Sequence, residues 1–291
     1  MKGKFAALLG AACLTAGIAW ADDYIPPVVG GHTYVQHMIT QARAAHPQIA
    51  SIVVVGVREG AKDTVIFGST ASAAQVFRPA TAEDRLGGSW TAGHRHYVVR
   101  EAYKSSSGHA IGTIIVTFNA AKGASTARFD AIADGIAAQM ARATLSAKNA
   151  ADPWPYDARF GPNTYAQQIT ERTVAKHPDL LVMMIHATPP GGGKNVIIGS
   201  NIGRFGKVAD EDDGRVINAG STNLEIGGDK DRFETELPLN DAHGKRIGAL
   251  GLVFSYHDGA DKDAIHAHGR AIRDEIARQI PNSAALFRHT R

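Results

Sequence analysis

The charged residues between positions 204 and 215 have the clearest capacity for ligand chemistry. An arginine can hold a carboxylate through two parallel hydrogen bonds, and an aspartate can accept an ammonium group. Such a segment suits a small zwitterion or acid, and its other interpretation is a solvated acidic loop. The candidate ligand-binding residues here are Arg204, Lys207, Asp210, Asp213 and Arg215.

Arg232 and Glu234 are two more candidates, because they alternate with apolar residues in a segment typical of a half-buried strand. The polar face of that strand either lines a pocket or faces solvent. Trp90, His96 and Tyr97 lie in or near the corresponding strand of the first half of the chain. The two aromatic residues suit pocket walls, although packing in a core is their ordinary role.

His94 and His96 give a metal hypothesis. Side chains two residues apart on a strand point to the same face, so this pair could hold a transition metal. The spacing places no third ligand, and the chain has 13 histidines, so an incidental pair is the simpler interpretation. We therefore assign no metal and no cofactor from the sequence.

Motifs of catalysis are absent from the sequence. It contains no Gly-x-Ser-x-Gly elbow, no His-Glu-x-x-His pair and no dinucleotide fingerprint. The single cysteine, Cys13, lies in the predicted leader, so cleavage would leave no thiol. We therefore expect a protein that is not an enzyme.

The N-terminus predicts export. A basic start precedes an apolar stretch, and Ala19-Trp20-Ala21 has the small-x-small pattern of a signal-peptidase site. We expect a signal peptide over residues 1–21, a mature chain from Asp22 and a periplasmic location. Lipidation at Cys13 is the alternative, although Gly10-Ala11-Ala12 lacks the usual branched residue before the cysteine.

Charge and hydropathy narrow the class of partner. Removal of Lys2 and Lys4 leaves 29 basic against 28 acidic residues, which gives no electrostatic drive toward nucleic acid. After the leader, no apolar stretch is long enough for a transmembrane segment. The expected partners are a small-molecule ligand and a membrane receptor or transporter.

An internal repeat divides the chain. Residues 33–70 align with residues 164–201 at a spacing of 131 without a gap, and 11 of the 38 positions are identical. The block from Gly108 to Phe118 recurs at a spacing of 136, and a proline-rich segment between the copies suits an extended connector. The predicted units are a signal peptide (1–21), a first domain (22–150), a linker (151–163) and a second domain (164–291).

Each copy has the same predicted elements. Thr33 and Thr164 are helix N-cap candidates, each with Gln three residues later, and each predicted helix ends at a His-Pro pair. A hairpin, an irregular segment, a second hairpin and a closing helix follow. This order predicts an α+β domain with an antiparallel sheet, an N-terminal helix and a C-terminal helix, built twice.

Two segments of the second copy resemble a known family. They are His177-Pro178-Asp179-Leu180 and the longer run Leu237-Pro238-Leu239-Asn240-Asp241-x-x-Gly244-Lys245-x-Ile247-Gly248. On these residues the copy looks like a Cache domain, the extracytoplasmic relative of PAS domains. The resemblance implies a long N-terminal helix on one face of the sheet. It also implies that a loop-rich segment covers the other face of the sheet. A ligand such as an amino acid, carboxylate or amine would bind beneath that segment.

Three functions fit these features. The resemblance favours an exported binding or sensing protein for a small charged metabolite, which passes its ligand or its state to a membrane partner. One alternative is a periplasmic metal or haem carrier tied to an outer-membrane uptake system. The other is a module that docks onto a protein partner and takes no small ligand.

Overall fold

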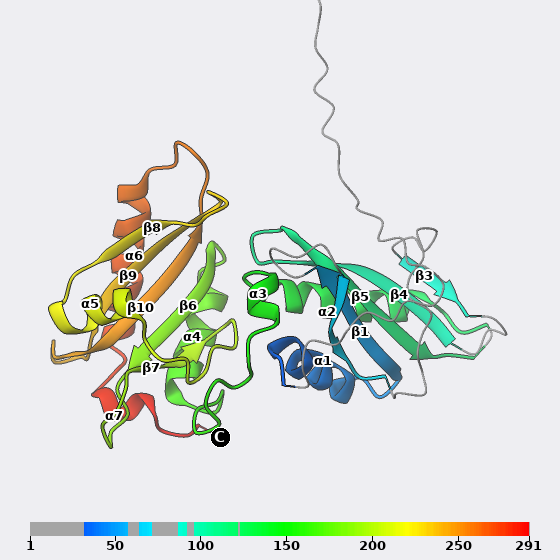
Figure 1. Cartoon of the computed structure of the whole chain (residues 1–291), viewed down its shortest axis with the longest axis horizontal. Helices are drawn as coiled ribbons and strands as arrows, with labels where there is room; N and C mark the ends of the chain where they lie inside the picture. The colour runs from blue at the N-terminus through cyan, green and yellow to red at the C-terminus, as the bar shows by residue number, and fades with distance from the viewer. Residues whose placement is uncertain (1–31, 58–63, 72–86, 92–95, 122, 291) are drawn as a thin grey trace, which may run out of the picture.

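The computed structural model describes residues 32–57, 64–71, 87–91, 96–121 and 123–290 (Figure 1). The predicted signal peptide and His94 lie outside these residues. Within them, the chain forms two α+β units, each with a five-stranded antiparallel sheet. None of the helices in these ranges combines the length and the apolar character needed to cross a lipid bilayer.

The first unit, here the N-domain, covers residues 32–150. Its sheet has the strand order β2-β1-β5-β4-β3. Its elements are α1 (Tyr34–Ala45), β1 (Ile49–Val57), β2 (Thr64–Ser69), β3 (Gly87–Trp90), β4 (His96–Lys104), β5 (Ala110–Asn119), α2 (Ala127–Arg142) and α3 (Ala147–Ala150).

The second unit, here the C-domain, covers residues 164–290. Its strand order β7-β6-β10-β9-β8 repeats that of the N-domain strand for strand. Its elements are α4 (Tyr165–Lys176), β6 (Leu180–Ala187), β7 (Val196–Ser200), α5 (Glu211–Ala219), β8 (Asn223–Ile226), β9 (Arg232–Asn240), β10 (Arg246–Ser255), α6 (Lys262–Ala277) and α7 (Ser283–Leu286).

The predicted helix starts lie at the expected residues in both domains. The hydroxyl of Thr33 accepts a hydrogen bond from the Gln36 amide, and that of Thr164 accepts one from the Gln167 amide. The opening helices α1 and α4 each have 12 residues, whereas the closing helices α2 and α6 each have 16. The longer helix in each domain is therefore the closing one, not the N-terminal one.

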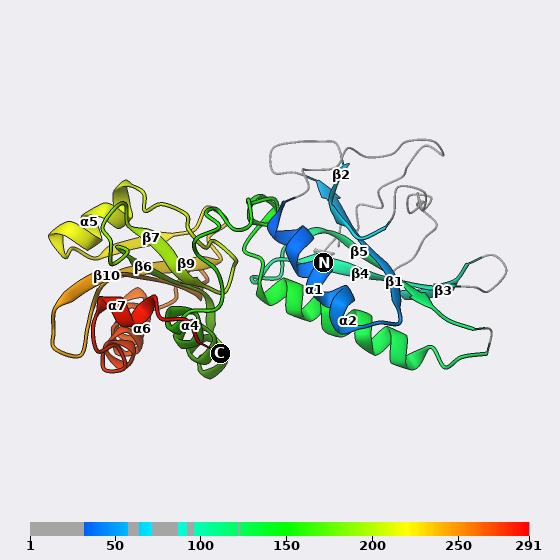
Figure 2. The same cartoon turned by 90° about the horizontal axis from the view of Figure 1, so that it is seen from below.

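One face of each sheet packs against the opening and closing helices. In the C-domain, Ile169 of α4 and Ile272 of α6 join Ile185, Leu237 and Leu252 of the sheet in one buried apolar cluster. Because side chains alternate along a strand, the residues between them point to the other face. Figure 2 shows α5 on that opposite side of the sheet, away from α4, α6 and α7.

The two domains contact each other directly. Gly203, with a φ of +72°, leaves room for the ring of Tyr34, because a Cβ at that glycine would lie 2.1 Å from Tyr34 Cε2. The side-chain amide of Asn149 donates to the carbonyl of Ile202 at 3.0 Å. The segment predicted as a linker also contacts the N-domain, where Trp154 stacks on His37 with ring centroids 3.3 Å apart.

Candidate functional site

The candidate site is the face of the C-domain sheet that α5 covers. On β9, Leu237 and Leu239 belong to the helix-side core, so Glu234 and Glu236 point to the α5 side. On β6 the same alternation takes His186 to the α5 side, because Ile185 and Ala187 belong to the core. Ionisable groups from two strands therefore gather beneath one helix.

The central strand of this face carries small residues. Gly251 of β10 pairs with Met184 of β6 on one side and with Glu236 of β9 on the other. A Cβ at Gly251 would make only ordinary van der Waals contacts, the nearest being to Met184 Cε at 3.4 Å and Glu234 Oε1 at 3.6 Å. The β10 residues between the histidine and the glutamates are thus Gly251 and Ala249, which pairs with His186.

His186 is the most deeply buried ionisable group of the site, and its side chain is 3% exposed. Neither ring nitrogen has a hydrogen-bond partner, although Nε2 lies 3.6 Å from Asp213 Oδ1. Burial lowers the pKa of His186, and the negative charge of Asp213 opposes this effect in part. At neutral pH the ring is therefore neutral, with one nitrogen free to donate and the other free to accept.

Helix α5 positions Asp213 by a capping box. The Asp210 side chain accepts from the Asp213 amide at 3.2 Å, and Asp213 Oδ2 accepts from the Asp210 amide at 2.8 Å. With Oδ2 used at the helix start, Asp213 Oδ1 is the oxygen that faces His186. The helix ends at Gly220, which has a φ of +73°.

Burial, together with the neighbouring carboxyl groups, raises the pKa values of both glutamates. Burial, the hydrogen bond to Asp213 and its negative charge raise the pKa of Glu236 to about 9. Burial raises the pKa of Glu234 to about 7, with a contribution from Glu225, its partner across β8 and β9. Glu236 Oε1 is buried and has no hydrogen-bond partner. The two glutamates thus ionise less readily than ordinary carboxyl groups, and a bound cation would favour their ionised forms.

The remaining predicted residues of segment 204–215 lie around the cluster or away from it. Lys207 and Asp210 are near enough for their charges to affect His186. The Arg204 side chain turns to the domain boundary, where Nε donates to Asp152 Oδ2 at 3.1 Å. Arg215 is half exposed and pairs with Asp212 on the outer surface of α5. Segment 211–219 is a helix, so the predicted loop is in part regular structure.

Arg232 also lies at the domain boundary. Its Nε donates to Asp231 Oδ1 at 3.2 Å, and one terminal nitrogen reaches the carbonyl of Leu145 in the N-domain at 3.5 Å. The side chain is 15% exposed, so this contact is largely shielded from solvent. Arg204 therefore contacts the segment that connects the domains, and Arg232 contacts the N-domain. The acidic residues remain as the centre of the site.

The predicted N-domain residues that the structure describes lie together at the start of β4, but they do not form a pocket wall there. Tyr97 is buried in the core under α2, where its hydroxyl donates to Asp130 at 2.9 Å. Trp90 pairs with Tyr97 across β3 and β4. The half-buried His96 begins β4, and His94 lies outside the described residues, so the proposed histidine pair stays a prediction.

Two central residues, His186 and Glu236, were absent from the predicted set. His186 follows an apolar run and Glu236 alternates with Leu237, so both carried the period-two signal of a strand. Asp210 and Asp213 have the three-residue spacing of a capping box, a signal for the start of α5. These patterns mark the face and the helix, but they do not show that α5 covers that face.

A groove of about 770 Å³ lies between the domains and is a second possible ligand site. Its walls come from α1, α2 and α4 and include Tyr34, Gln139, Gln167 and Asn201. Its volume fits a small ligand. The buried polar atoms without partners at His186 and Glu236, however, lie on the α5 face, so we place the charged-ligand chemistry there.

Comparisons with known proteins give little further guidance. The sequence matches no protein-family model and no curated protein. Among solved structures, it is similar to the repressor BlcR of Agobacterium tumefaciens, with 10% sequence identity and a TM-score of 0.28. That likeness covers 40% of this chain and 67% of the repressor.

Proposed function

We propose that this protein binds a small metabolite with a cationic amine, beneath α5 of the C-domain. The observation that carries the proposal is the buried His186, whose two ring nitrogens have no hydrogen-bond partner. It lies next to Asp213, which is hydrogen-bonded in turn to Glu236. Buried polar groups in folded proteins are almost always hydrogen-bonded, so unpaired ones suit a ligand. The resemblance to Cache domains supports the same location, because their ligands sit under the segment that covers the sheet.

The charge of the cluster selects an amine over an acid. Asp213, Glu234 and Glu236 lie close enough to raise the pKa values of the two glutamates, so another anion would add repulsion. An ammonium group would reverse that repulsion and could donate hydrogen bonds to Asp213, Glu236 and the neutral ring of His186. Lys207, whose charge acts on His186, would meet a carboxylate on the same ligand, as in an amino acid, because Arg204 is already paired with Asp152.

The wider role we propose is that of an exported, periplasmic binding or sensing module without enzymatic activity. The predicted signal peptide and the resemblance to extracytoplasmic sensors support it. A membrane receptor or transporter would then read the ligand-bound state. Arg204 could couple the ligand site to the domain boundary. Its charge acts on Glu234 in the site, and its side chain pairs with Asp152 at the boundary.

Calorimetric and thermal-shift screens of amines, amino acids and organic acids test the proposal. We expect saturable binding of an amine, and an affinity at least 10-fold lower in Glu236→Gln and in Asp213→Asn. Arg215→Ala is the matched control, because this half-exposed residue lies on the outer surface of α5. Selective binding of acids, or equal affinity in the wild type and both variants, would refute the amine site.

The pH dependence separates the two ligand classes further. Binding of a cation drives Glu236 to its ionised form, and its pKa of about 9 means that protons must leave. Amine affinity should therefore rise between pH 7 and pH 9, with proton release seen as a buffer-dependent heat. An affinity that falls over this range would indicate an anionic ligand.

A further inference from the structure

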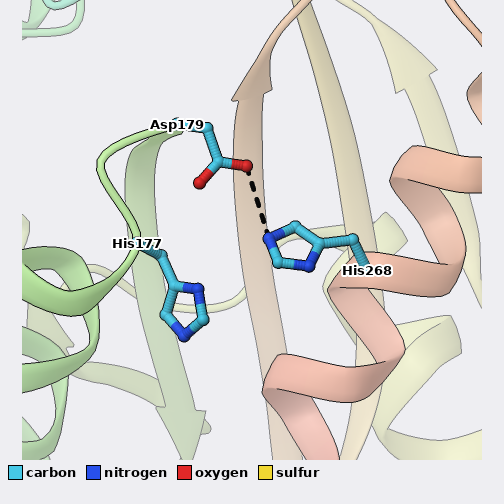
Figure 3. A group of neighbouring side chains, drawn as sticks. All are labelled: His177, Asp179 and His268. Atoms are coloured by element: carbon cyan, nitrogen blue, oxygen red, sulfur yellow. Dashed lines mark ion pairs between the residues drawn. The ribbon is translucent and has the colours of Figure 1, made fainter.

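A second cluster of ligand-type side chains lies on the other side of the C-domain sheet. Its members are His177, Asp179 and His268, and one ligand atom from each lies within 4.8 Å of the others. His177 is the C-cap residue of α4, Asp179 directly precedes β6, and His268 is on α6. Figure 3 shows the carboxylate and the two rings converging from these three elements.

The distances are close to those of a metal site. His268 Nε2 lies 3.3 Å from Asp179 Oδ2. Bonds of 2.0 to 2.2 Å to a tetrahedral zinc ion separate neighbouring ligand atoms by about 3.3 Å. The two rings are edge to face with centroids 5.4 Å apart, so small rotations would bring both nitrogens to one ion.

The present contacts leave His177 without a hydrogen bond at Nε2. This nitrogen is buried and lies 3.9 Å from Glu275 Oε2, whereas the other ring nitrogen is on the side of Asp179 and His268 (Figure 3). Lys176 already holds Glu275 at 2.6 Å. The side chains of Asp179 and His268 are 55% and 40% exposed, so an ion could enter from solvent.

The N-domain shows that this cluster is not a by-product of the repeated fold. At the repeat spacings of 131 and 136, His177 corresponds to His46, Asp179 to Gln48 and His268 to Ile132. Only the histidine at the helix end is common to both copies. The carboxylate and the second imidazole are thus additions of the C-domain.

We infer that His177, Asp179 and His268 bind one divalent transition-metal ion of the zinc class. Two imidazoles and one carboxylate suit such a borderline ion, and a water molecule would complete four-coordination. The ion would join the start of β6 to the closing helix α6. This site is independent of the proposed amine site, which lies on the opposite face of the sheet.

Zinc titration of the whole protein, purified without a histidine tag and stripped of metal, tests the inference. We expect one saturable site per chain by calorimetry. His268→Asn and His177→Gln should each weaken zinc at least 10-fold, whereas His46→Gln, the matched N-domain change, should leave the affinity unchanged. Near-saturating zinc should also raise the midpoint of C-domain unfolding by about 5 °C.

A variant at an exposed side chain separates loss of the metal from loss of the fold. Asp179→Asn keeps the shape of a largely exposed side chain and removes only the charged ligand atom. It should lower the zinc affinity and shift the visible absorption of bound Co²⁺. The inference is overturned if the wild type binds no zinc. It is overturned equally if binding survives these changes and is lost in His109→Gln, which belongs to the other group of His and Asp side chains.

Discussion

The two domains share a scaffold but differ on the face opposite their helices. At the repeat spacings, His186, Glu236 and Gly251 of the C-domain correspond to Val55, Arg100 and Ile115 of the N-domain. The strand pairing agrees, because Glu236 pairs with Gly251 as Arg100 pairs with Ile115. Two sheets of the same topology thus differ here, because the C-domain has an imidazole, an acid and a glycine where the N-domain has valine, arginine and isoleucine.

The two copies differ mainly on the sheet face that lies opposite the opening and closing helices. The helix-side residues remain apolar in both copies, for example Ile136 and Ile272. On the other face, the change from Ile115 to Gly251 removes a side chain at the centre of the sheet. Core packing therefore requires apolar residues on the helix side of both sheets. The opposite face of the C-domain sheet carries polar groups, which favour binding at a cost in stability.

The largest expected effect tests whether the scaffold is the same in both domains. A Cβ at Gly112 would lie 1.9 Å from the carbonyl oxygen of Val55, and one at Gly248 would lie 1.8 Å from that of His186. Gly112→Ala and Gly248→Ala should each destabilise their own domain by about 3 kcal/mol, because backbone cannot yield as a side chain can.

Hydrogen exchange measured peptide by peptide would separate the two domains in this experiment. Gly135→Ala is the control, since a Cβ there has no neighbour within 4 Å and the residue lies in α2. Similar tolerance of alanine at all three glycines would contradict the shared close approach of the strands.

The second prediction separates the domains by pH. The folded-state pKa of Glu236, about 9, exceeds its ordinary value of 4.5, so its contribution to stability is complete below pH 4.5 and is lost as the pH rises toward 9. Between pH 5 and pH 7 the C-domain should lose about 2 to 3 kcal/mol from this group. Glu236→Gln should remove that loss, as measured by urea unfolding followed by hydrogen exchange.

Tryptophan fluorescence offers a control for the same experiment. After residue 21 the tryptophans are Trp90 and Trp154, which stacks on His37 of the N-domain, and residues 164–291 contain none. The fluorescence transition therefore reports the N-domain, which carries Arg100 at the equivalent position. If Glu236→Gln changes the fluorescence transition and leaves C-domain exchange unaltered, the carboxyl cluster is not the source of the pH dependence.

Much of the fold, but only part of the site, could be predicted from the sequence. The N-caps at Thr33 and Thr164, the α+β class and the antiparallel sheets follow from local spacing and period, and the structure confirms them. The centre of the site depends on which face α5 covers, which is a tertiary contact. For that reason the sequence pointed to Asp213 but not to His186, which lies beside it beneath α5. It also could not show that the side chains of Arg204 and Arg232 lie at the domain boundary.

The third prediction is an equal effect in the two domains. The side chains of Thr33 and Thr164 cap α1 and α4, and each hydroxyl also donates to a strand carbonyl, of Phe67 at 3.0 Å and of Ile198 at 3.2 Å. Thr33→Ala and Thr164→Ala should each cost their own domain about 1 to 2 kcal/mol. Chemical unfolding with domain-resolved exchange measures both, and a cost confined to one domain would show that the repeat is not energetically equivalent.

The smallest effect is a gain in stability at the cost of binding. His186→Val gives the buried position beneath α5 the residue type that the N-domain has at the equivalent Val55. It removes two ring nitrogens that have no partner, so the C-domain should be unchanged or gain up to about 1 kcal/mol, even though the smaller side chain leaves some space. The same variant should lose affinity for the amine selected in the screen, because the ligand loses a hydrogen-bond partner. A marked loss of stability would mean that His186 has an internal structural role, and the contrast between the two faces would then no longer indicate a binding site.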